Sequence, residues 1–580
     1  MKSRWYRILI ILPVVFCLWL VPAYGQNYLL MNNTDFTNTP RLLPYHDGTM
    51  GSDALGDNPA LIDVDGGQVF LFDSWYSGST SRVGVESYFF QQNIFFGPPY
   101  AYSVSDGRET WRTNSVGTNL GVALRTGDRA SALFLLEYRY NDVTMDGNST
   151  YSVYDITFPG WPDPVSLNNT SELRDVDIHD IAISALYDVN ISDTLSVGMG
   201  LRYEYGYERS DYSRTDAGYD WWPGWPILEY EDAWIDKTFE MERHRFAPVL
   251  GISASPVDRL RLDFTMEGGV TIGTVEEKAT MSEITYDFFG VVGASSGAYR
   301  TDSNSLFGWD LLLAVDGSYE MSDTLAIPFF AEFSRKSQSW GMDGYSSGFY
   351  YTTISPVLSM EEGPTTFRDD SSEWSLLLGG GVEFPLGEYN AAAMLSYEHM
   401  KYRHSSYMSN YDINGYGWGI PVEVVYDDLL RETRDILSVE FMLDRTFSDL
   451  LAASFRLRYD VGFGRMELDR FAVPAQDFDP TFVPVPELTF DYSDRDIYQN
   501  LSFFLDLAVT PLDRLTIDLA GMMVVPLDGL EYSMKGSATG AYFGDWWWTP
   551  WHLTFEGPSS VGTDVSTWEY GGKIELRYEF

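Results

Sequence analysis

The segment LSVGMGLRYEYGYE, Leu195 to Glu208, alternates between two kinds of residue without a break. Successive side chains of an extended chain point to opposite faces, so one face would carry Leu, Val, Met and Tyr and the other Ser, Gly, Arg and Glu. Such alternation predicts a β-strand with one apolar and one polar face. The tyrosines gather at one end, as in the aromatic belt where a membrane strand meets water.

A short acidic turn precedes this segment and recurs along the chain. Its copies are centred on Asp128, Asp193, Asp258, Asp323, Glu388, Asp449 and Asp513. Successive copies are 65, 65, 65, 65, 61 and 64 residues apart, and alternating segments flank each of them. This periodicity indicates that one hairpin unit is repeated: a long loop, a strand, a tight turn and a second strand.

Seven turns define seven hairpins, and a first strand near Gly67–Tyr76 and a last near Trp568–Phe580 complete sixteen strands. An even number of strands with alternating short and long connections is typical of an outer-membrane barrel. A sheet in lipid must close, because an open edge would leave backbone groups unpaired. We therefore predict an all-β fold, a transmembrane antiparallel barrel spanning residues 67–580. A soluble antiparallel protein would not need an apolar face on every strand.

The chain ends on KIELRYEF, Lys573 to Phe580, which alternates to its last residue. We predict that this final strand pairs with the first near Val69–Trp75 and closes the wall. A terminal aromatic on an alternating strand resembles the signal by which the barrel-assembly machinery of outer membranes recognises its clients. The resemblance assigns this role to Tyr578 and Phe580. An aromatic of the membrane interface is the plainer interpretation of Phe580.

The N-terminus has the pattern of a secretory signal: a cationic start, an apolar run from Ile8 to Leu20, and small residues at Ala23 and Gly25. We expect residues 1–25 to be cleaved and the mature protein to lie in the outer membrane of a bacterial cell. A transmembrane anchor is the alternative, for which the apolar run is short. Cys17 is the only cysteine, so the mature chain has no disulfide and no thiolate site.

The composition excludes further classes of protein. The formal net charge is −46, which repels nucleic acid. Disorder, the usual alternative for a highly charged chain, conflicts with 44% hydrophobic and 16% aromatic residues. We expect the partners to be outer-membrane lipid, the assembly machinery and an unidentified small solute, with no nucleic acid.

The polar faces of the alternating segments are expected to line the lumen, because a barrel of 16–18 strands encloses an aqueous channel unless something fills it. The expected lumen-lining charges are Glu137, Arg139, Arg202, Glu204, Arg261, Asp263, Arg456, Arg458 and Asp460. Structural ion-pair ladders and a charged filter for solutes are both compatible with these residues.

The expected outer loops are rich in Trp and Pro, as in DWWPGWPILEY from Asp220 and FGDWWWTPW from Phe543. Their aromatic candidates are Trp221, Trp222, Trp225, Trp546, Trp547 and Trp548. Aromatic side chains could stack on a ligand or could pack loop against loop as a lid. The first interpretation predicts a surface ligand-binding or adhesin-like barrel.

The motifs of zinc proteases and of nucleotide-binding sites are absent from the sequence, which contains no HExxH and no P-loop. Barrel hydrolases nevertheless use His–acid pairs, so His179, near Asp177 and Asp180, and the pair His399 and His404 were considered. Isolated surface histidines are commoner. We expect no enzyme activity, no cofactor, no metal and no catalytic residue.

Residues 26–66 show no sustained alternation and form either a periplasmic leader or a plug folded into the lumen. Their end, GDNPALI from Gly56 to Ile62, precedes the first strand directly. This arrangement resembles the N-terminus of the FadL/TodX family of outer-membrane channels for long-chain fatty acids and other hydrophobic compounds. In that family an N-terminal hatch ends in Asn-Pro-Ala, matched here by Asn58, Pro59 and Ala60.

The resemblance implies a plugged barrel whose ligand leaves sideways through the wall. It also implies fourteen strands, where the repeat predicts sixteen, so fourteen remains the alternative. Together the observations favour a channel for passive passage of small solutes, with hydrophobic compounds as one class. A surface-binding barrel is the alternative function, and a barrel enzyme is a third.

Overall fold

The computed structural model describes residues 58–62, 68–92, 100–155, 166–221, 228–286, 292–322, 324–352, 359–412, 422–448, 450–474, 488–512, 514–528, 530–546 and 549–580. Within these ranges the chain is almost entirely β-strand, with one short 3₁₀ helix, η3 (Pro59–Leu61). No helix in the described part of the chain is long and apolar enough to cross a bilayer.

The strands follow one another in the order of the sequence. The first nine are β1 (Gln68–Gln92), β2 (Tyr100–Gly127), β3 (Ala130–Asp155), β4 (Ser166–Ser192), β5 (Leu195–Trp221), β6 (Leu228–Val257), β7 (Leu260–Tyr286), β8 (Val292–Ser322) and β9 (Leu325–Thr352). The others are β10 (Ser359–Leu386), β11 (Tyr389–Asp412), β12 (Val422–Ser448), β13 (Leu451–Pro474), β14 (Leu488–Leu512), β15 (Leu515–Asp528), β16 (Leu530–Trp546) and β17 (Thr549–Glu579).

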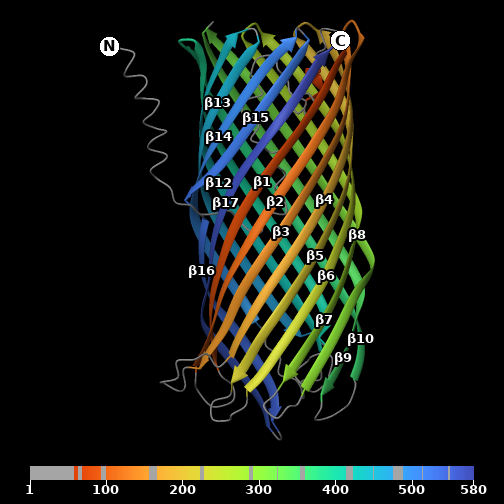
Figure 1. Cartoon of the computed structure of the whole chain (residues 1–580), viewed down its shortest axis with the longest axis vertical. Helices are drawn as coiled ribbons and strands as arrows, with labels where there is room; N and C mark the ends of the chain where they lie inside the picture. The colour runs from red at the N-terminus through yellow and green to blue at the C-terminus, as the bar shows by residue number, and fades with distance from the viewer. Residues whose placement is uncertain are drawn as a thin grey trace, which may run out of the picture.

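Each strand pairs antiparallel with its neighbours in the sequence, except that β15 and β16 each pair with β14 and β17, and β17 pairs with β1 to close the barrel. Figure 1 shows β1 beside β17, with the short turns and the C-terminus at one end. The predicted closure is confirmed in its register, from Val69 opposite Glu579 to Trp75 opposite Lys573. The amide of Phe580 donates a hydrogen bond to the carbonyl of Gln68 at 3.0 Å, which extends this seam by one residue.

The described strands number seventeen but form a sixteen-strand barrel, as the repeat predicts. β15 and β16 share one position in the wall, since β14 and β17 each pair with both of them. Pro526 lies close to their junction and has no backbone N–H to donate to a neighbouring strand. The fourteen-strand alternative is therefore wrong.

The predicted repeat of turns is visible in the backbone. The amide of Asn190 donates to the carbonyl of Arg129 at 2.8 Å, and Ser255 repeats the bond to Thr194 at 2.8 Å in the next hairpin. The turn near Glu388 contains Gly387, whose φ of 71° lies in the left-handed region that glycine adopts without strain. The short turns thus form a bonded rim at one end of the barrel.

The strands are longer than a bilayer requires. β8 has 31 residues and β13 has 24, whereas a tilted strand crosses a membrane with about 9–11. Exposed apolar side chains on the outer face, such as Leu201, Phe246 and Leu250, lie in the half nearer the short turns. That half is the membrane-spanning part of the barrel, and the wall continues beyond it toward the long loops.

Candidate channel interior

The Asn-Pro-Ala motif lies inside the barrel near the short turns. η3 packs against β4, β5 and β6, and Pro59 and Ala60 are buried. The side chain of Asn58 accepts a hydrogen bond from the amide of Ala60 at 2.9 Å, and it donates one to the carbonyl of Phe264 at 3.5 Å. Asn58 therefore caps η3 and joins it to β7.

Two glycines of the wall make room for this motif. A Cβ atom on Gly198 would lie 2.2 Å from the carbonyl carbon of Pro59, and one on Gly251 would lie 2.1 Å from Oδ1 of Asn58. Both glycines belong to the inward-facing sets of β5 and β6. Only a residue without a side chain lets the motif approach the wall so closely.

Ile62, the second residue after the motif, anchors the motif in an apolar floor. Ile62 is fully buried. It belongs to a cluster with Val69, Leu71, Ala123, Leu133, Leu135, Leu186 and Val249, contributed by the inner faces of β1, β2, β3, β4 and β6. The predicted polar lumen is therefore apolar at this end, where the N-terminal segment enters the barrel.

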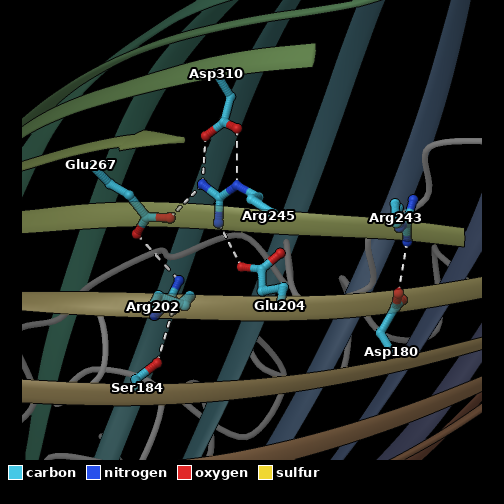
Figure 2. Close-up of polar contacts among 8 residues, drawn as sticks. All are labelled: Asp180, Ser184, Arg202, Glu204, Arg243, Arg245, Glu267 and Asp310. Atoms are coloured by element: carbon cyan, nitrogen blue, oxygen red, sulfur yellow. Dashed lines mark hydrogen bonds and ion pairs between the residues drawn. The ribbon is translucent and has the colours of Figure 1, made fainter. Parts of the chain in front are cut away.

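Beyond this floor, a belt of charges crosses the inner face of β5–β8, and Arg245 lies at its centre. Figure 2 shows its guanidinium between three carboxylates. It donates to Glu204 at 2.6 Å, to Glu267 at 2.6 Å and to Asp310 at 2.9 and 2.5 Å. Arg245 is thus fully engaged by acids from three strands.

The belt continues toward β4. Arg202 donates to Glu267 at 3.2 Å and to Ser184 at 3.2 Å. Arg243 donates to Asp180 at 2.8 Å (Figure 2). The side chain of Glu267 is only 8% exposed, so its charge depends on these partners.

Sequence reasoning found Arg202 and Glu204 but missed Arg245 and Asp310. The 65-residue repeat carried the missing signal, because residues one repeat apart occupy corresponding places in adjacent hairpins. Arg202 lies 65 residues before Glu267, and Arg245 lies 65 before Asp310. A search for opposite charges at this separation would have found both contacts.

The other predicted lumen residues also lie on the inner face but form separate groups. Arg458 contacts Asp460 at 2.6 Å, and Arg456 contacts Asp506 at 3.3 Å. Arg261 contacts Asp263 at 3.0 Å. The guanidinium of Arg139 lies 5.9 Å from the ring centre of Trp75, and Glu137 lies on the same strand, β3.

The inner wall becomes apolar again on the loop side of the belt. Met241, Val275, Leu306 and Met342 are buried there and contact Phe239, Trp340 and Phe367. A smaller cluster joins Trp111 and Met145 to Val143 and Tyr212. Sequence reasoning, which assigned these faces to a polar lumen, did not predict this apolar cluster.

Two ionisable groups near the apolar clusters have shifted pKa values. Burial lowers the pKa of Lys237 to about 8, and the positive charge of Arg174 acts in the same direction. Lys237 also contacts Glu277. Burial raises the pKa of the Tyr212 hydroxyl, so both shifts favour the neutral form.

Four histidines whose side chains are described have local partners. His179 faces outward, with Nδ1 3.1 Å from the hydroxyl of Tyr138, and His244 repeats this contact with Tyr203 at 2.9 Å. Asp177 accepts a hydrogen bond from Tyr140 at 2.6 Å. The neighbouring acid Asp180 points into the lumen, toward Arg243, so the structure does not join it to His179.

The later histidines form two separate acid pairs. His399 contacts Asp435 at 2.7 Å on the outer face, and His404 contacts Asp369 at 2.6 Å on the inner face. No group of three or more His, Cys, Asp or Glu able to hold a metal ion occurs among the residues that the structure describes.

Two sets of predictions fall largely outside the described residues. They are the signal and leader, residues 1–57, and the loop aromatics Trp222, Trp225, Trp547 and Trp548. Trp221 ends β5 and Trp546 ends β16, and only their backbones are described.

No family model and no curated protein matches the chain. Among solved structures it is similar to a FadL homologue of Pseudomonas aeruginosa, with 10% identity and a TM-score of 0.31, over 91% of this chain and 94% of the other. For the Pseudomonas putida toluene transporter TodX the values are 11%, 0.31, 91% and 94%. For the Escherichia coli outer-membrane protease OmpT they are 12%, 0.21, 56% and 98%. Likenesses of this size assign no family and no activity.

Proposed function

We propose that the protein is a bacterial outer-membrane channel for passive passage of small solutes. We further propose that the loop-side part of its lumen, beside the apolar cluster and called the chamber below, accepts apolar ones. The apolar cluster on the inner wall is the observation that carries the proposal. A general aqueous pore has a polar interior, whereas here Met241, Val275, Leu306 and Met342 lie on the inner wall. Ligand pockets of this kind are lined mainly by apolar and aromatic side chains.

The charged belt and the N-terminal motif give the channel two further parts. A solute leaving the chamber meets the belt around Arg245 and then the floor that holds Asn58–Ile62. We propose that residues 26–66 act as a plug, of which the Asn-Pro-Ala motif is the anchored end. The closely fitted glycines Gly198 and Gly251 support this role.

Planar-bilayer conductance of the refolded full chain, with and without residues 26–66, tests the plug and the pore. We expect little conductance from the full chain and a clear increase after the deletion. Absence of conductance in both would count against a channel. Full conductance of the undeleted chain would support a pore but would contradict the proposed plug.

Binding of the apolar fluorophore N-phenylnaphthylamine tests the chamber separately. Trp340 contacts the chamber, so bound dye should accept energy from tryptophan. We expect Leu306→Gln with Met342→Gln to weaken dye binding about tenfold, because both buried side chains lose apolar surface. Leu201→Gln with Leu250→Gln, on the outer face, is the matched control. Equal binding by both double variants would contradict the chamber.

We also propose that Tyr578 and Phe580 form the signal read by the barrel-assembly machinery. The two rings are in contact, with centroids 4.8 Å apart, and the side chain of Phe580 is 60% exposed. Deleting Phe580 should reduce the amount of folded barrel in the membrane. An unchanged heat-modifiable band on a gel would argue against this role.

A further inference from the structure

Lys237 lies on the inner face of β6, between the two apolar clusters of the loop-side wall. Phe239, the next inward residue of the same strand, contacts the larger cluster. On the neighbouring strand β5, Tyr212 is directly opposite Lys237 and contacts the smaller cluster. On the other side, the buried Ala279 of β7 is opposite Lys237. The side chain of Lys237 is 37% exposed, so a solute in the chamber can reach its amine.

The ionisable side chains around Lys237 come from the neighbouring strands of the same wall. They are Glu172 and Arg174 of β4, Glu208, Tyr212 and Arg214 of β5, and Glu277 of β7. Glu277 is in contact with the Lys237 amine, and its side chain is only 3% exposed. Arg174 acts on Lys237 as a like charge. Glu172 interacts with Tyr212 and Arg214, and Glu208 interacts with Arg243 and Arg174.

This setting favours a neutral amine on Lys237. Burial and the charge of Arg174 lower its pKa to about 8, whereas the pKa of a lysine in water is about 10.4. At about pH 7.5 the neutral fraction is then on the order of a hundredfold larger than for a lysine in water. The neutral amine is the nucleophilic form, and desolvation or a neighbouring cation is a way in which proteins activate a lysine.

The contact with Glu277 is compatible with a neutral amine. A charge buried in an apolar environment is costly, and buried groups commonly become neutral instead. The carboxylate of Glu277 can accept the proton that the Lys237 amine loses, and the pair then contains no charge. The contact therefore places a proton acceptor directly beside the amine.

Two other lysines on the inner face have different surroundings. Lys336 of β9 is exposed and lies opposite Asp310, which belongs to the charged belt. Lys573 of β17 contacts Glu575 at 3.4 Å in the half nearer the short turns. Neither is described in contact with the apolar clusters of the loop-side wall.

We propose that Lys237 is a reversible covalent binding site for apolar aldehydes that enter the chamber. The inference rests on the proposed function, and it specifies one class of solute for the chamber. An aldehyde carries no charge, so it reaches the amine without the cost of burying an ion. The apolar clusters on both sides of Lys237 supply contact surface for its alkyl or aryl part.

The reaction is the formation of an imine. The neutral amine attacks the carbonyl carbon, the C–N bond forms, and Glu277 moves a proton from the nitrogen to the carbonyl oxygen. Glu277 next takes up the second nitrogen-bound proton and delivers it to the hydroxyl group, which leaves as water while the C=N bond forms. The net change is R–CHO and Lys–NH₂ to R–CH=N–Lys and water. It needs no oxidant or reductant, and hydrolysis reverses it.

Octanal and glycolaldehyde test the site with the full chain refolded in micelles. Sodium cyanoborohydride reduces each imine to a stable amine, and mass spectrometry of the peptides locates it. At about pH 7.5 we expect octanal to label Lys237 at least roughly tenfold faster than Lys336 or the exposed Lys278 of β7. Equal rates at the three lysines overturn the proposal. An equal preference for Lys237 with glycolaldehyde, which has no apolar part, overturns the assignment to apolar aldehydes.

The pH dependence separates an activated lysine from one that is only accessible. Labelling of Lys237 should rise up to about pH 8 and then level off, because the amine is then mostly neutral. Labelling of a lysine in water continues to rise toward about pH 10. A rate at Lys237 that also rises to that pH overturns the proposal. This measurement uses the unsubstituted chain and does not depend on the folding of a variant.

Lys237→Arg keeps a positive charge beside Glu277 but cannot form an imine, so it should remove the octanal label from this position. Lys278→Arg is the matched control on the neighbouring strand and should leave the labelling of Lys237 unchanged. Equal total labelling of the two variants overturns the proposal.

Binding of N-phenylnaphthylamine by the same preparation separates this inference from the proposed function. Dye binding without octanal on Lys237 overturns the aldehyde site and leaves the chamber in place. Absence of both overturns both.

Discussion

Arg245 and Arg431 lie on opposite faces of the same wall and have opposite kinds of surroundings. On the inside, Arg245 donates to three carboxylates. On the outside, Arg431 faces Arg403 and shares Glu467 with Arg465. Buried charges must be compensated by the protein itself, whereas exposed charges can be compensated by water, salt or a ligand. The inner belt is therefore a structural device, whereas the outer arginines lie where water and salt can share in compensating their charge.

Replacing Arg245 by Met should destabilise the inner belt. Three carboxylates would then lose their common cation, and Glu267 would remain buried. We expect the free energy of unfolding to fall by about 3 kcal/mol or more, the usual cost of breaking a buried ion pair. Urea unfolding of the refolded barrel, followed by tryptophan fluorescence, measures it. Arg209→Met removes an exposed arginine and should leave the midpoint unchanged, and a similar loss in both would refute the distinction.

Replacing Glu267 by Gln should have a smaller effect. Arg245 keeps Glu204 and Asp310, and the new amide still accepts one hydrogen bond. We expect a loss of about 1.5 kcal/mol, within the range for a hydrogen bond to a charged group. The same urea titration measures it. A loss as large as that of Arg245→Met would mean that Glu267 alone, not the set of three acids, stabilises the belt.

Alanine substitutions at two adjacent glycines test whether the belt needs the space beside the wall. A Cβ atom on Gly269 would lie 2.4 Å from Oδ1 of Asp310 and 2.6 Å from Nε of Arg245. One on Gly268, which faces outward, would meet nothing closer than 3.8 Å. We expect Gly269→Ala to cost about 1 kcal/mol through displaced ion pairs. Gly268→Ala should not destabilise the barrel, and equal effects on the thermal midpoint would contradict this reading.

Substitution of an outer arginine should change the stability in the opposite direction. In micelles without anionic lipid, Arg403→Gln removes a like charge opposite Arg431. We expect a gain of about 0.2–1 kcal/mol in the free energy of unfolding. A loss of stability without lipid would show that Arg403 is compensated within the barrel.

Much of the architecture followed from the pattern of residues. The alternation in Leu195–Glu208 and the spacing of the acidic turns predicted the strand number, and the alternation at the end of the chain predicted that the last strand pairs with the first near Val69–Trp75. Both signals are local or periodic, so they do not depend on knowing which strands meet. The inward side of Arg202, Arg261 and Arg456 also followed, because side chains alternate strictly along a strand.

The arrangement of the candidate site could be predicted less well from the sequence. Composition along a single strand could not reveal that Met241 on β6 and Met342 on β9 meet in one apolar cluster. It also could not show that Arg245 is compensated by carboxylates from three strands. These properties depend on the stagger between strands, and a shift of one residue in register would move every side chain to the other face.

From the residue pattern alone one learns the class of object: a closed barrel with sixteen strand positions, short turns at one end and an apolar outer band. Period-two alternation and a 65-residue repeat are sufficient, because each strand must present one face to lipid. Only the folded wall decided where the Asn-Pro-Ala motif lies, which charges are paired and where the interior becomes apolar. The physical reason is that pairing and packing join residues from several strands, and their relative heights are set by the register of the whole barrel.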